Sequence, residues 1–297
     1  MADMLQDQYT SVFSTPRYDS FDPSEMDDAE GLTDINFDEP DIGEAIDEVS
    51  DTAAAGPDGV AAYFLKKCKL AICRPLYILY RDSLDAGYLN ESTKGSSIVP
   101  LHKGDSRGLP ANYRPVSLTS HLVKILEKVI RKNMVKYLEE KGLFNPSQHG
   151  FCAGRSCLSQ LLEYYDKILR LVEDGKCVDT VYLDFSKAFD KVDHVILLRK
   201  LKAAGIGGKL GRWIHSFLTD RKQVVMVNGI ASRSAPVVSG VPQGTVLGPL
   251  LFLMYIADID DGVKYSFLSS FADDTRILED IETVMDTFKL QYDLNIA

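Results

Sequence analysis

Apolar residues recur every three to four positions over several stretches of this chain, and that period predicts amphipathic helices. The clearest stretch spans 119–141, where Gly142 follows the last apolar position as a stop signal. A similar pattern over 60–84 predicts one or two helices, broken or bent near Pro75. Shorter helices are predicted at 42–49, 156–173, 193–204, 209–219, 246–259 and 282–290.

Alternating apolar and polar residues predict strands between these helices. In 178–185, Val181 and Leu183 would lie on one face, and Tyr182 and Asp184 on the other. The dipeptide Asn228-Gly229 predicts a hairpin turn, through which the strands 223–227 and 235–238 would pair. The remaining strands are predicted at 97–101, 223–227, 235–238, 265–271 and 275–278, with a polar loop over 102–114.

Charge is distributed unevenly along the chain, although its total is only −10. Residues 1–50 carry a net charge of −14 and are expected to form an acidic linker with a short helix, the linker covering 14–41. Residues 51–250 carry +11, and 251–297 carry −7. A basic block of this size suits a polyanion partner, but a solvated, lysine-rich helical surface would explain it equally well.

The composition, with 45% hydrophobic and 26% charged residues, excludes a disordered or collagen-like chain. The longest apolar run, 247–257, is too short to span a bilayer, and residues 1–7 lack a basic segment followed by an apolar one. No signal peptide and no membrane contact are therefore expected. Five cysteines without a C-x-x-C pair predict a reduced, intracellular protein without zinc. Nucleus and cytoplasm are not distinguished.

Two acidic sites stand where predicted strands end. Asp184 closes an apolar strand, and Asp273-Asp274 occupies a tight turn between two others. Taken singly, Asp184 would serve as a helix cap and the pair as ordinary turn residues. Taken together, three converging carboxylates would need a cation, and hard oxygen ligands suit Mg²⁺. Two such ions roughly 3.5–4 Å apart would activate an attacking hydroxyl and stabilise a leaving phosphate oxygen.

Seven motifs in this order resemble the reverse transcriptase domain of non-LTR retrotransposons. Any one of them is weak, but their order and spacing over about 240 residues are specific. They are Ala55-Gly56-Pro57-Asp58-Gly59, the segments 98–105 and 112–118, Gln148-His149-Gly150-Phe151, Asp184-Phe185-Ser186-Lys187-Ala188-Phe189-Asp190, the segment 240–252 around Pro242-Gln243-Gly244, and Phe271-Ala272-Asp273-Asp274.

The resemblance implies an α+β fold of the right-hand polymerase kind. Residues 51–177 would form mainly the fingers, and 178–297 mainly the palm, whose antiparallel sheet packs on helices. Relatives continue with a helical thumb and carry an endonuclease upstream. The chain is therefore expected to be truncated, with the thumb missing.

The resemblance also implies the residues that bind metal. Asp184 and Asp273 would be the main ligands, Asp274 would complete the triad, and the carbonyl of Phe185 would approach a metal. Two Mg²⁺ ions are expected, with Mn²⁺ as an alternative. The primer 3′-hydroxyl would attack the α-phosphate of a dNTP on an RNA or DNA template, and pyrophosphate would leave.

Other residues acquire substrate roles from the resemblance. Phe189 would pack under the sugar and select dNTP over NTP, although a core position is the simpler interpretation. Lys103 and Arg114 would contact the triphosphate, and Gln243 the incoming nucleotide; without the family they would be surface charges and a plain turn. Template phosphates would be contacted by Arg155, Lys124, Lys128 and Arg131, with Lys132 and Lys136, unless these form only a solvated helix face.

The predicted function is an RNA-directed DNA polymerase domain that acts on an RNA template, a DNA primer and dNTPs. A non-catalytic nucleic-acid-binding remnant is the alternative from another class. A two-metal nuclease and a group II intron or retron polymerase are further alternatives. The sequence leaves the oligomeric state and the activity of this chain alone open.

Overall fold

The computed structural model describes residues 1–15 and 21–296, and the chain forms two compact units. Unit 1 contains Met1–Gly142 and Phe189–Leu251, and unit 2 contains Leu143–Ala188 and Phe252–Ala297. Each unit is thus built from two separate segments. The expected boundaries at residues 50 and 177 do not coincide with this division, because residues 143–176 pack with the C-terminal segment.

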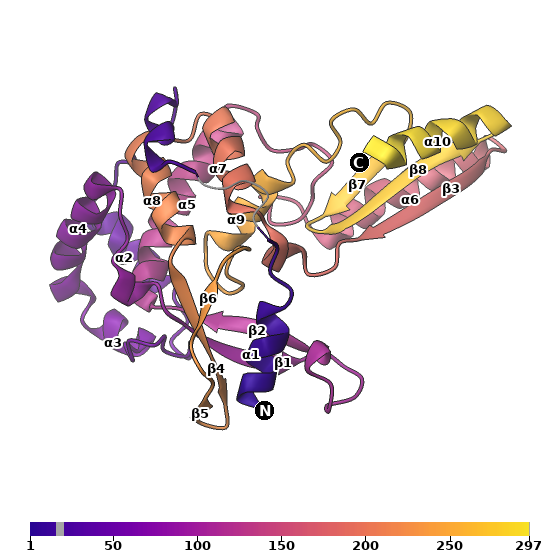
Figure 1. Ribbon diagram of the computed structural model, residues 1–297. Coiled ribbons are helices and arrows are strands. Elements are labelled where there is room, and N and C mark those ends of the chain that lie inside the picture. Colours follow the sequence, from indigo (N-terminus) through magenta and orange to yellow (C-terminus); the bar gives the residue numbers. More distant parts are fainter. Residues whose placement is uncertain (16–20, 297) are drawn as a thin grey trace. The chain divides into compact units, whose positions relative to one another are not determined.

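Unit 1 contains a five-stranded sheet with the order β2-β1-β4-β5, and β6 pairs with β4 (Figure 1). β1 and β2 are antiparallel, whereas β1 and β4 are parallel. Asn228-Gly229 joins β4 to β5, which confirms the predicted hairpin turn. The strand across this turn is the short β5, whereas the predicted partner, β6, pairs with the start of β4. The strands are β1 (Ser96–His102), β2 (Tyr113–Leu118), β4 (Arg221–Val227), β5 (Ile230–Ala231) and β6 (Ala235–Val237).

Strand β2 was not predicted, and its first residues fall in the stretch 102–114 that the sequence pattern predicts as a polar loop. The strand also contains Pro115, and proline cannot donate to a strand ladder. The structure accommodates this proline at a sheet edge, where it stands opposite Pro100 of β1. Pro100 lies beyond Ser96–Ile98, the part of β1 that pairs with β4. Neither proline therefore removes a hydrogen-bond donor from a pairing with a second neighbouring strand.

Helices make up much of the rest of unit 1 and confirm most of the predicted ones. The predicted break in 60–84 falls at Cys68 rather than Pro75, which lies inside a helix. Trp213 and Phe217 are fully buried and stacked, with ring centroids 5.6 Å apart. The helices are α1 (Ala2–Thr10), α2 (Glu39–Asp47), α3 (Ala62–Lys67), α4 (Lys69–Ala86), α5 (His121–Glu140), α7 (His194–Ala203), α8 (Gly208–Leu218) and α9 (Gly248–Tyr255), which crosses into unit 2.

The acidic N-terminal region is packed into unit 1, where a linker was expected. Leu5 and Tyr9 of α1 join a buried cluster with Ile98 and Val225. Further along, Met26 of the 3₁₀ helix Pro23–Asp28 is fully buried. The many carboxylates obscured these sparse apolar positions in the sequence pattern. Residues 16–20 of the expected linker lie outside the described part of the chain.

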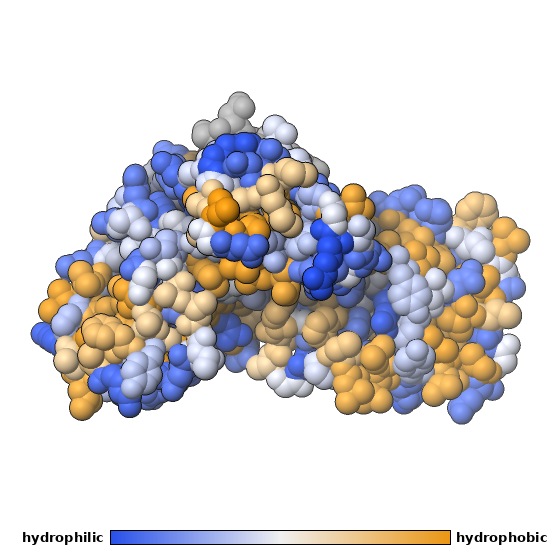
Figure 2. All heavy atoms as spheres, turned by 90° about the horizontal axis from the view of Figure 1, so that it is seen from below, coloured by the Kyte–Doolittle hydropathy of each residue, from blue (hydrophilic) through white to orange (hydrophobic). Residues whose placement is uncertain are grey.

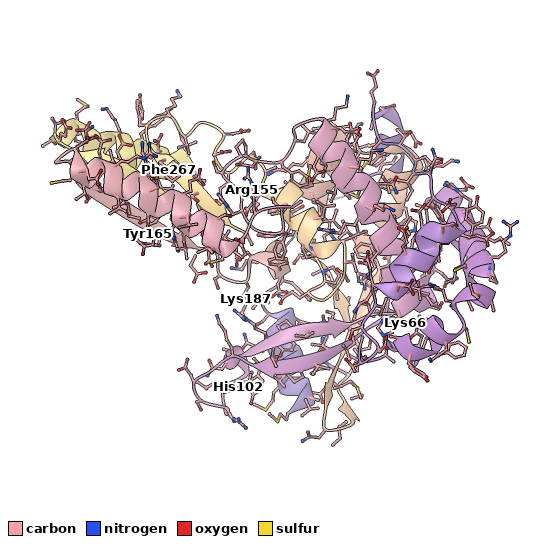
Figure 3. The ribbon with its side chains drawn as sticks, turned by 180° about the vertical axis from the view of Figure 1, so that it is seen from behind. Lys66, His102, Arg155, Tyr165, Lys187 and Phe267 are labelled. Atoms are coloured by element: carbon pink, nitrogen blue, oxygen red, sulfur yellow. The ribbon has the colours of Figure 1, made fainter. Side chains whose placement is uncertain are left out.

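Unit 2 contains a three-stranded antiparallel sheet with the order β3-β8-β7. Tyr164 and Leu171 of α6 pack on one face against Leu278, and Leu290 of α10 packs on the other against Ile277. Figure 3 shows α6 lying over the strands. The elements are α6 (Cys157–Glu173), β3 (Cys177–Asp184), β7 (Phe267–Phe271), β8 (Asp274–Ile281) and α10 (Val284–Ile296).

Apolar side chains also reach the surface of unit 2. Leu158, Leu162, Tyr165 and Leu169 are all more than half exposed and recur at helical spacing along α6. Figure 2 shows hydrophobic groups among charged ones on the surface of this unit, at the right. Within residues 1–15 and 21–296, no helix combines the length and the apolar character that a membrane crossing requires.

Asp293 ties α10 to the segment that leads into β7, and it predicts a pH-dependent stability. Burial alone raises the pKa of this carboxyl, but the N–H groups of Lys264, Ser266 and Tyr265 that bond to it lower the pKa by more. Because the native pKa lies below 3.8, the carboxylate stabilises the fold above pH 3.8, and this contribution is lost as the pH falls through the native pKa.

We expect Asp293→Asn to lower the free energy of unfolding at pH 7 by about 2 kcal/mol, since a single amide oxygen replaces a carboxylate bonded to three donors. The difference from wild type should shrink as the pH falls below 3.8. Urea unfolding at pH 7, 5 and 3 measures the difference in the free energy of unfolding. The control is Asp261→Asn, a substitution of an exposed residue. A difference that stays constant over this range would contradict the prediction.

Candidate active site

Two carboxylates face each other where strands of unit 2 end. Asp184 is the last residue of β3, Asp274 is the first residue of β8, and the two are direct partners across the antiparallel pair. Directly opposed residues project to the same face, and both side chains are exposed. Leu183 projects to the other face and packs in the cluster under α10. The alternation predicted for this strand is therefore confirmed.

The third carboxylate lies in the turn between β7 and β8. Phe271 pairs with Asp274, which leaves Ala272 and Asp273 as the two turn residues. The strand predicted over 275–278 therefore begins one residue before its predicted start, at Asp274. Asp273 is half-buried, and Ala272 has a φ of +53°. A positive φ at the first position of a two-residue hairpin is a conformation that favours glycine.

These carboxylates have the chemistry of a site for a hard cation. Like charges placed directly opposite each other repel, and a divalent cation bound between Asp184 and Asp274 would remove that repulsion. Within residues 1–15 and 21–296, however, no three Asp, Glu, His or Cys side chains are grouped as metal ligands. The geometry thus brings Asp184 and Asp274 together, and their role as metal ligands stays a prediction. Asp273 as a third, and the carbonyl of the exposed Phe185, stay predictions.

Lys103 and Arg114 lie together on one hairpin of unit 1. The N–H of Lys103 donates to the carbonyl of Asn112 at 2.8 Å, and Arg114 stands opposite Leu101 in the β1–β2 register. Both side chains are exposed. The hairpin therefore presents a point charge and a planar guanidinium near its tip, as a triphosphate-binding surface would require.

Phe189 and Gln243 are brought together in unit 1 by a network of hydrogen bonds. The carbonyl of Phe189 accepts from Val241 N at 2.8 Å, and Gln243 Nε2 donates to Asp190 Oδ1 at 3.1 Å. The carbonyl of Gln243 accepts from Ser117 N at 2.8 Å, so the same loop reaches β2. Asp190 was not predicted as a site residue, although it closes the motif that begins at Asp184.

Glycines allow this close approach. A Cβ on Gly240 would lie 2.8 Å from the backbone of Asp190, and one on Gly244 would lie 2.6 Å from the carbonyl oxygen of Ser117. Both glycines also have positive φ angles. A small pocket beside them is lined by Tyr9, Pro115, Asp190 and Gln243, among other residues. Only the fold shows that Tyr9, from the N-terminal helix, reaches this pocket.

The cations expected to contact template phosphates occupy different settings. On α5, Lys128 Nζ lies 3.0 Å from Glu48, and burial lowers the pKa of the half-buried Lys124. Arg131 is half-buried on the same helix. In unit 2, Arg155 donates to the carbonyl of Gln148 at 2.6 Å and also to that of Pro146. Phosphate binding by these four residues stays a prediction, and two of them already make polar contacts within the protein.

Comparison with known proteins adds an independent observation. The model of a family described as "Reverse transcriptase (RNA-dependent DNA polymerase)" matches residues 101–290. The chain is 31% identical to the probable RNA-directed DNA polymerase from transposon BS of Drosophila melanogaster over 245 residues, which cover 80% of the chain and 27% of that protein.

Other curated proteins are similar to the same extent. The probable RNA-directed DNA polymerase from transposon X-element of Drosophila melanogaster is 31% identical over 246 residues, 81% of the chain and 27% of that protein. The polymerase from the mobile element jockey of the same species is 30% identical over 218 residues, 71% of the chain and 24% of that protein. The chain thus spans about a quarter of the length of the curated relatives it matches.

Proposed function

This chain belongs to the reverse transcriptase (RNA-dependent DNA polymerase) family, and from that premise we propose that it carries the polymerising centre of an RNA-directed DNA polymerase of the non-LTR retrotransposon kind. The single observation that supports this most is the pairing of Asp184 with Asp274 across two strand ends, with Asp273 in the adjoining turn. All three residues fall inside the matched region.

The mixed helices and sheets of the chain fit a domain of this family. We assign the sheet of β3, β8 and β7 to the palm, because it carries the carboxylates. The β1–β2 hairpin with Lys103 and Arg114 is assigned to the fingers. The right-hand description is supported by the resemblance of the motifs.

The proposed reaction is attack of a primer 3′-hydroxyl on the α-phosphate of a dNTP, with departure of pyrophosphate. Members of the family generally use divalent metal ions. When bound, two Mg²⁺ ions would activate the hydroxyl and neutralise charge on the leaving phosphate, and Mn²⁺ would substitute for them. Asp184 and Asp274 would hold these ions with Asp273. The rest of catalysis is positioning of the reactants by the chain.

The remaining roles concern substrate binding. Lys103 and Arg114 would bind the triphosphate by charge-assisted hydrogen bonds. Phe189 would exclude a 2′-hydroxyl by its bulk, and Gln243, held by Asp190, would contact the nucleotide. An RNA template and a DNA primer are the proposed partners, with Arg155, Lys124, Lys128 and Arg131 as candidate phosphate contacts.

Extension of an oligo(dT) primer on poly(rA) tests this proposal. The chain should incorporate dTTP in the presence of Mg²⁺, and an Asp273→Asn/Asp274→Asn variant should not. Equal signals from the two proteins would support a non-catalytic nucleic-acid-binding remnant. Cleavage of the nucleic acid without added dNTP would support a two-metal nuclease. Either result would overturn the polymerase assignment.

A further inference from the structure

We infer that Gln148 is a positioning residue, which fixes the backbone of the Ala272-Asp273 turn and thereby directs the two carboxylates that follow Ala272. This inference rests on the proposed function, since it gives Asp273 and Asp274 a role in catalysis. Gln148 belongs to the motif Gln148-His149-Gly150-Phe151, to which the proposed reaction assigns no task. It lies 124 residues before the turn that it contacts.

The turn needs support, because its backbone is strained. Ala272 has a φ of +53°, where the Cβ of an L-residue approaches the following carbonyl. Such a conformation persists only when the surrounding structure enforces it, and strained residues of this kind cluster at active sites. Ala272 is also only 5% exposed, so that water cannot readily satisfy its peptide groups.

Gln148 satisfies both backbone groups of Ala272. Its Oε1 accepts from Ala272 N at 2.7 Å, and its Nε2 donates to the carbonyl oxygen of Ala272 at 3.3 Å. The same Oε1 also accepts from Gly150 N at 2.7 Å. An amide side chain is required for this pattern, because the contact needs an acceptor and a donor on one rigid plane. Gln148 itself is 5% exposed.

The backbone around Gln148 is fixed to the same hairpin. Ser270 N donates to the carbonyl of Ser147, and His149 N donates to the carbonyl of Ser270, each at 2.8 Å. This parallel bridge adds the segment to the edge of β7. A Cβ on Gly150 would lie 2.4 Å from Ala272 N, so that only glycine permits this approach. The loop therefore fits against the turn itself.

The loop is in turn held by side chains of unit 2. His149 contacts Ser159 at 2.9 Å through Nδ1 and Glu163 at 2.7 Å through Nε2, which fixes it to α6. Ser147 Oγ donates to Asp260 at 3.1 Å, and the guanidinium of Arg155 donates to the carbonyl of Gln148 at 2.6 Å. Because its own support is this extensive, Gln148 can impose a conformation on the turn.

The consequence for chemistry follows from the covalent order. Ala272 immediately precedes Asp273, and a rotation about its φ and ψ would redirect both carboxylates. A misplacement of about 1 Å in a catalytic group lowers the rate by about 100-fold. Gln148 thus influences the reaction through the turn, without needing to touch a substrate.

Gln148→Met tests the inference, because methionine has a similar length and lacks the hydrogen bonds. The matched control is Gln160→Met. Gln160 is 2% exposed and donates to the carbonyl of Ser269 at 3.3 Å. Ser269 lies on β7, the strand that leads into the turn, but not in the turn itself. The readouts are amide hydrogen exchange of the peptide covering 267–275, Mn²⁺ binding by electron paramagnetic resonance, and the kcat and KM for dTTP on poly(rA).

For Gln148→Met we expect exchange at the turn to accelerate about tenfold, as for the loss of one hydrogen bond of ordinary strength. Mn²⁺ binding should weaken by at least about fivefold and kcat should fall by at least about tenfold, with the KM for dTTP little changed, as for groups displaced from their productive geometry. Gln160→Met should lose similar stability without these effects. Equal Mn²⁺ affinities and kcat values for the two variants would overturn the inference.

One further variant keeps the test decisive if Gln148→Met does not fold, and a second tests the role of the backbone if it does. Gln148→Glu retains an acceptor for the N–H groups of Ala272 and Gly150, and should preserve slow exchange at the turn. Ala272→Gly removes the strain, because glycine adopts a positive φ freely. In the Gln148→Met background, Ala272→Gly should raise kcat by at least about threefold. This gain is expected if backbone strain at the turn causes the loss of kcat in Gln148→Met. No recovery would contradict a role through this backbone.

The failure of the proposed function can be recognised separately. If the wild-type chain neither extends the primer nor binds Mn²⁺ in a way that Asp273→Asn/Asp274→Asn removes, the polymerase assignment falls and the positioning role falls with it. If the wild type passes both tests and Gln148→Met behaves as Gln160→Met does, only the positioning role is overturned.

Discussion

Primer extension by Asp184→Asn is expected to fall by roughly 100-fold to 1000-fold relative to wild type, the loss typical of removing one electrostatic contribution to a transition state. Asp184 is exposed and directly opposite Asp274, so its carboxylate is available to a cation. An amide of nearly the same size keeps the strand and removes the charge. Steady-state incorporation of dTTP on poly(rA) measures the loss.

The control for this prediction is Asp179→Asn. Asp179 lies on the same strand, is exposed, and stands opposite another acid, Glu279. Its removal relieves repulsion between like charges, so the variant should be as active as wild type and slightly more stable, by about 0.5 kcal/mol. Comparable losses of activity in both variants would show that any charge change on β3 lowers the activity. That result would contradict a specific role of Asp184 in the reaction.

Trp213→Ala is expected to lower the free energy of unfolding by about 3–5 kcal/mol, the range for truncating a buried large aromatic residue. Trp213 is fully buried, stacks on Phe217, and donates its indole N–H to Ser83 Oγ at 2.9 Å. The substitution therefore leaves a cavity between α4 and α8 and removes one hydrogen bond to the Ser83 hydroxyl, which still donates to the carbonyl of Tyr88. Urea unfolding followed by far-ultraviolet circular dichroism measures the change, since the variant has no tryptophan fluorescence.

Tyr63→Ala is the matched control in the same unit. Tyr63 is 58% exposed, and its ring contacts the ammonium of Lys67 at 5.4 Å. An exposed aromatic residue of this kind contributes little, so a change within about 0.5 kcal/mol is expected. If the two substitutions were equally destabilising, Trp213 would not be a central part of the core.

Local patterns predicted much of the secondary structure. The period of α5, α6, α7 and α8 was evident because each helix buries one face, and the stop at Gly142 was correctly placed. Where a local rule conflicted with the tertiary structure, the prediction failed. The start of β2 falls within the stretch predicted as a polar loop, and the dense carboxylates of residues 1–50 concealed the buried positions of α1.

The motifs also predicted which carboxylates belong to the candidate site. Asp184 and Asp274 are 90 residues apart in the sequence and adjacent in the sheet, as their placement at strand ends suggested. Their order relative to the other motifs indicated the family, which the comparisons then showed. Whether Asp273 joins them as a ligand depends on the turn, and no periodicity determines that.

The sequence by itself determined most of the helices, most of the strands and the identity of the acidic residues at the candidate site, because side-chain periodicity and turn chemistry are local properties. Only the tertiary structure decided that Gln148 holds the turn beside them. A side chain that bonds to backbone groups leaves no pattern in the sequence of its partner, since every residue carries the same N–H and C=O. Such contacts become visible only when distant segments are placed against each other.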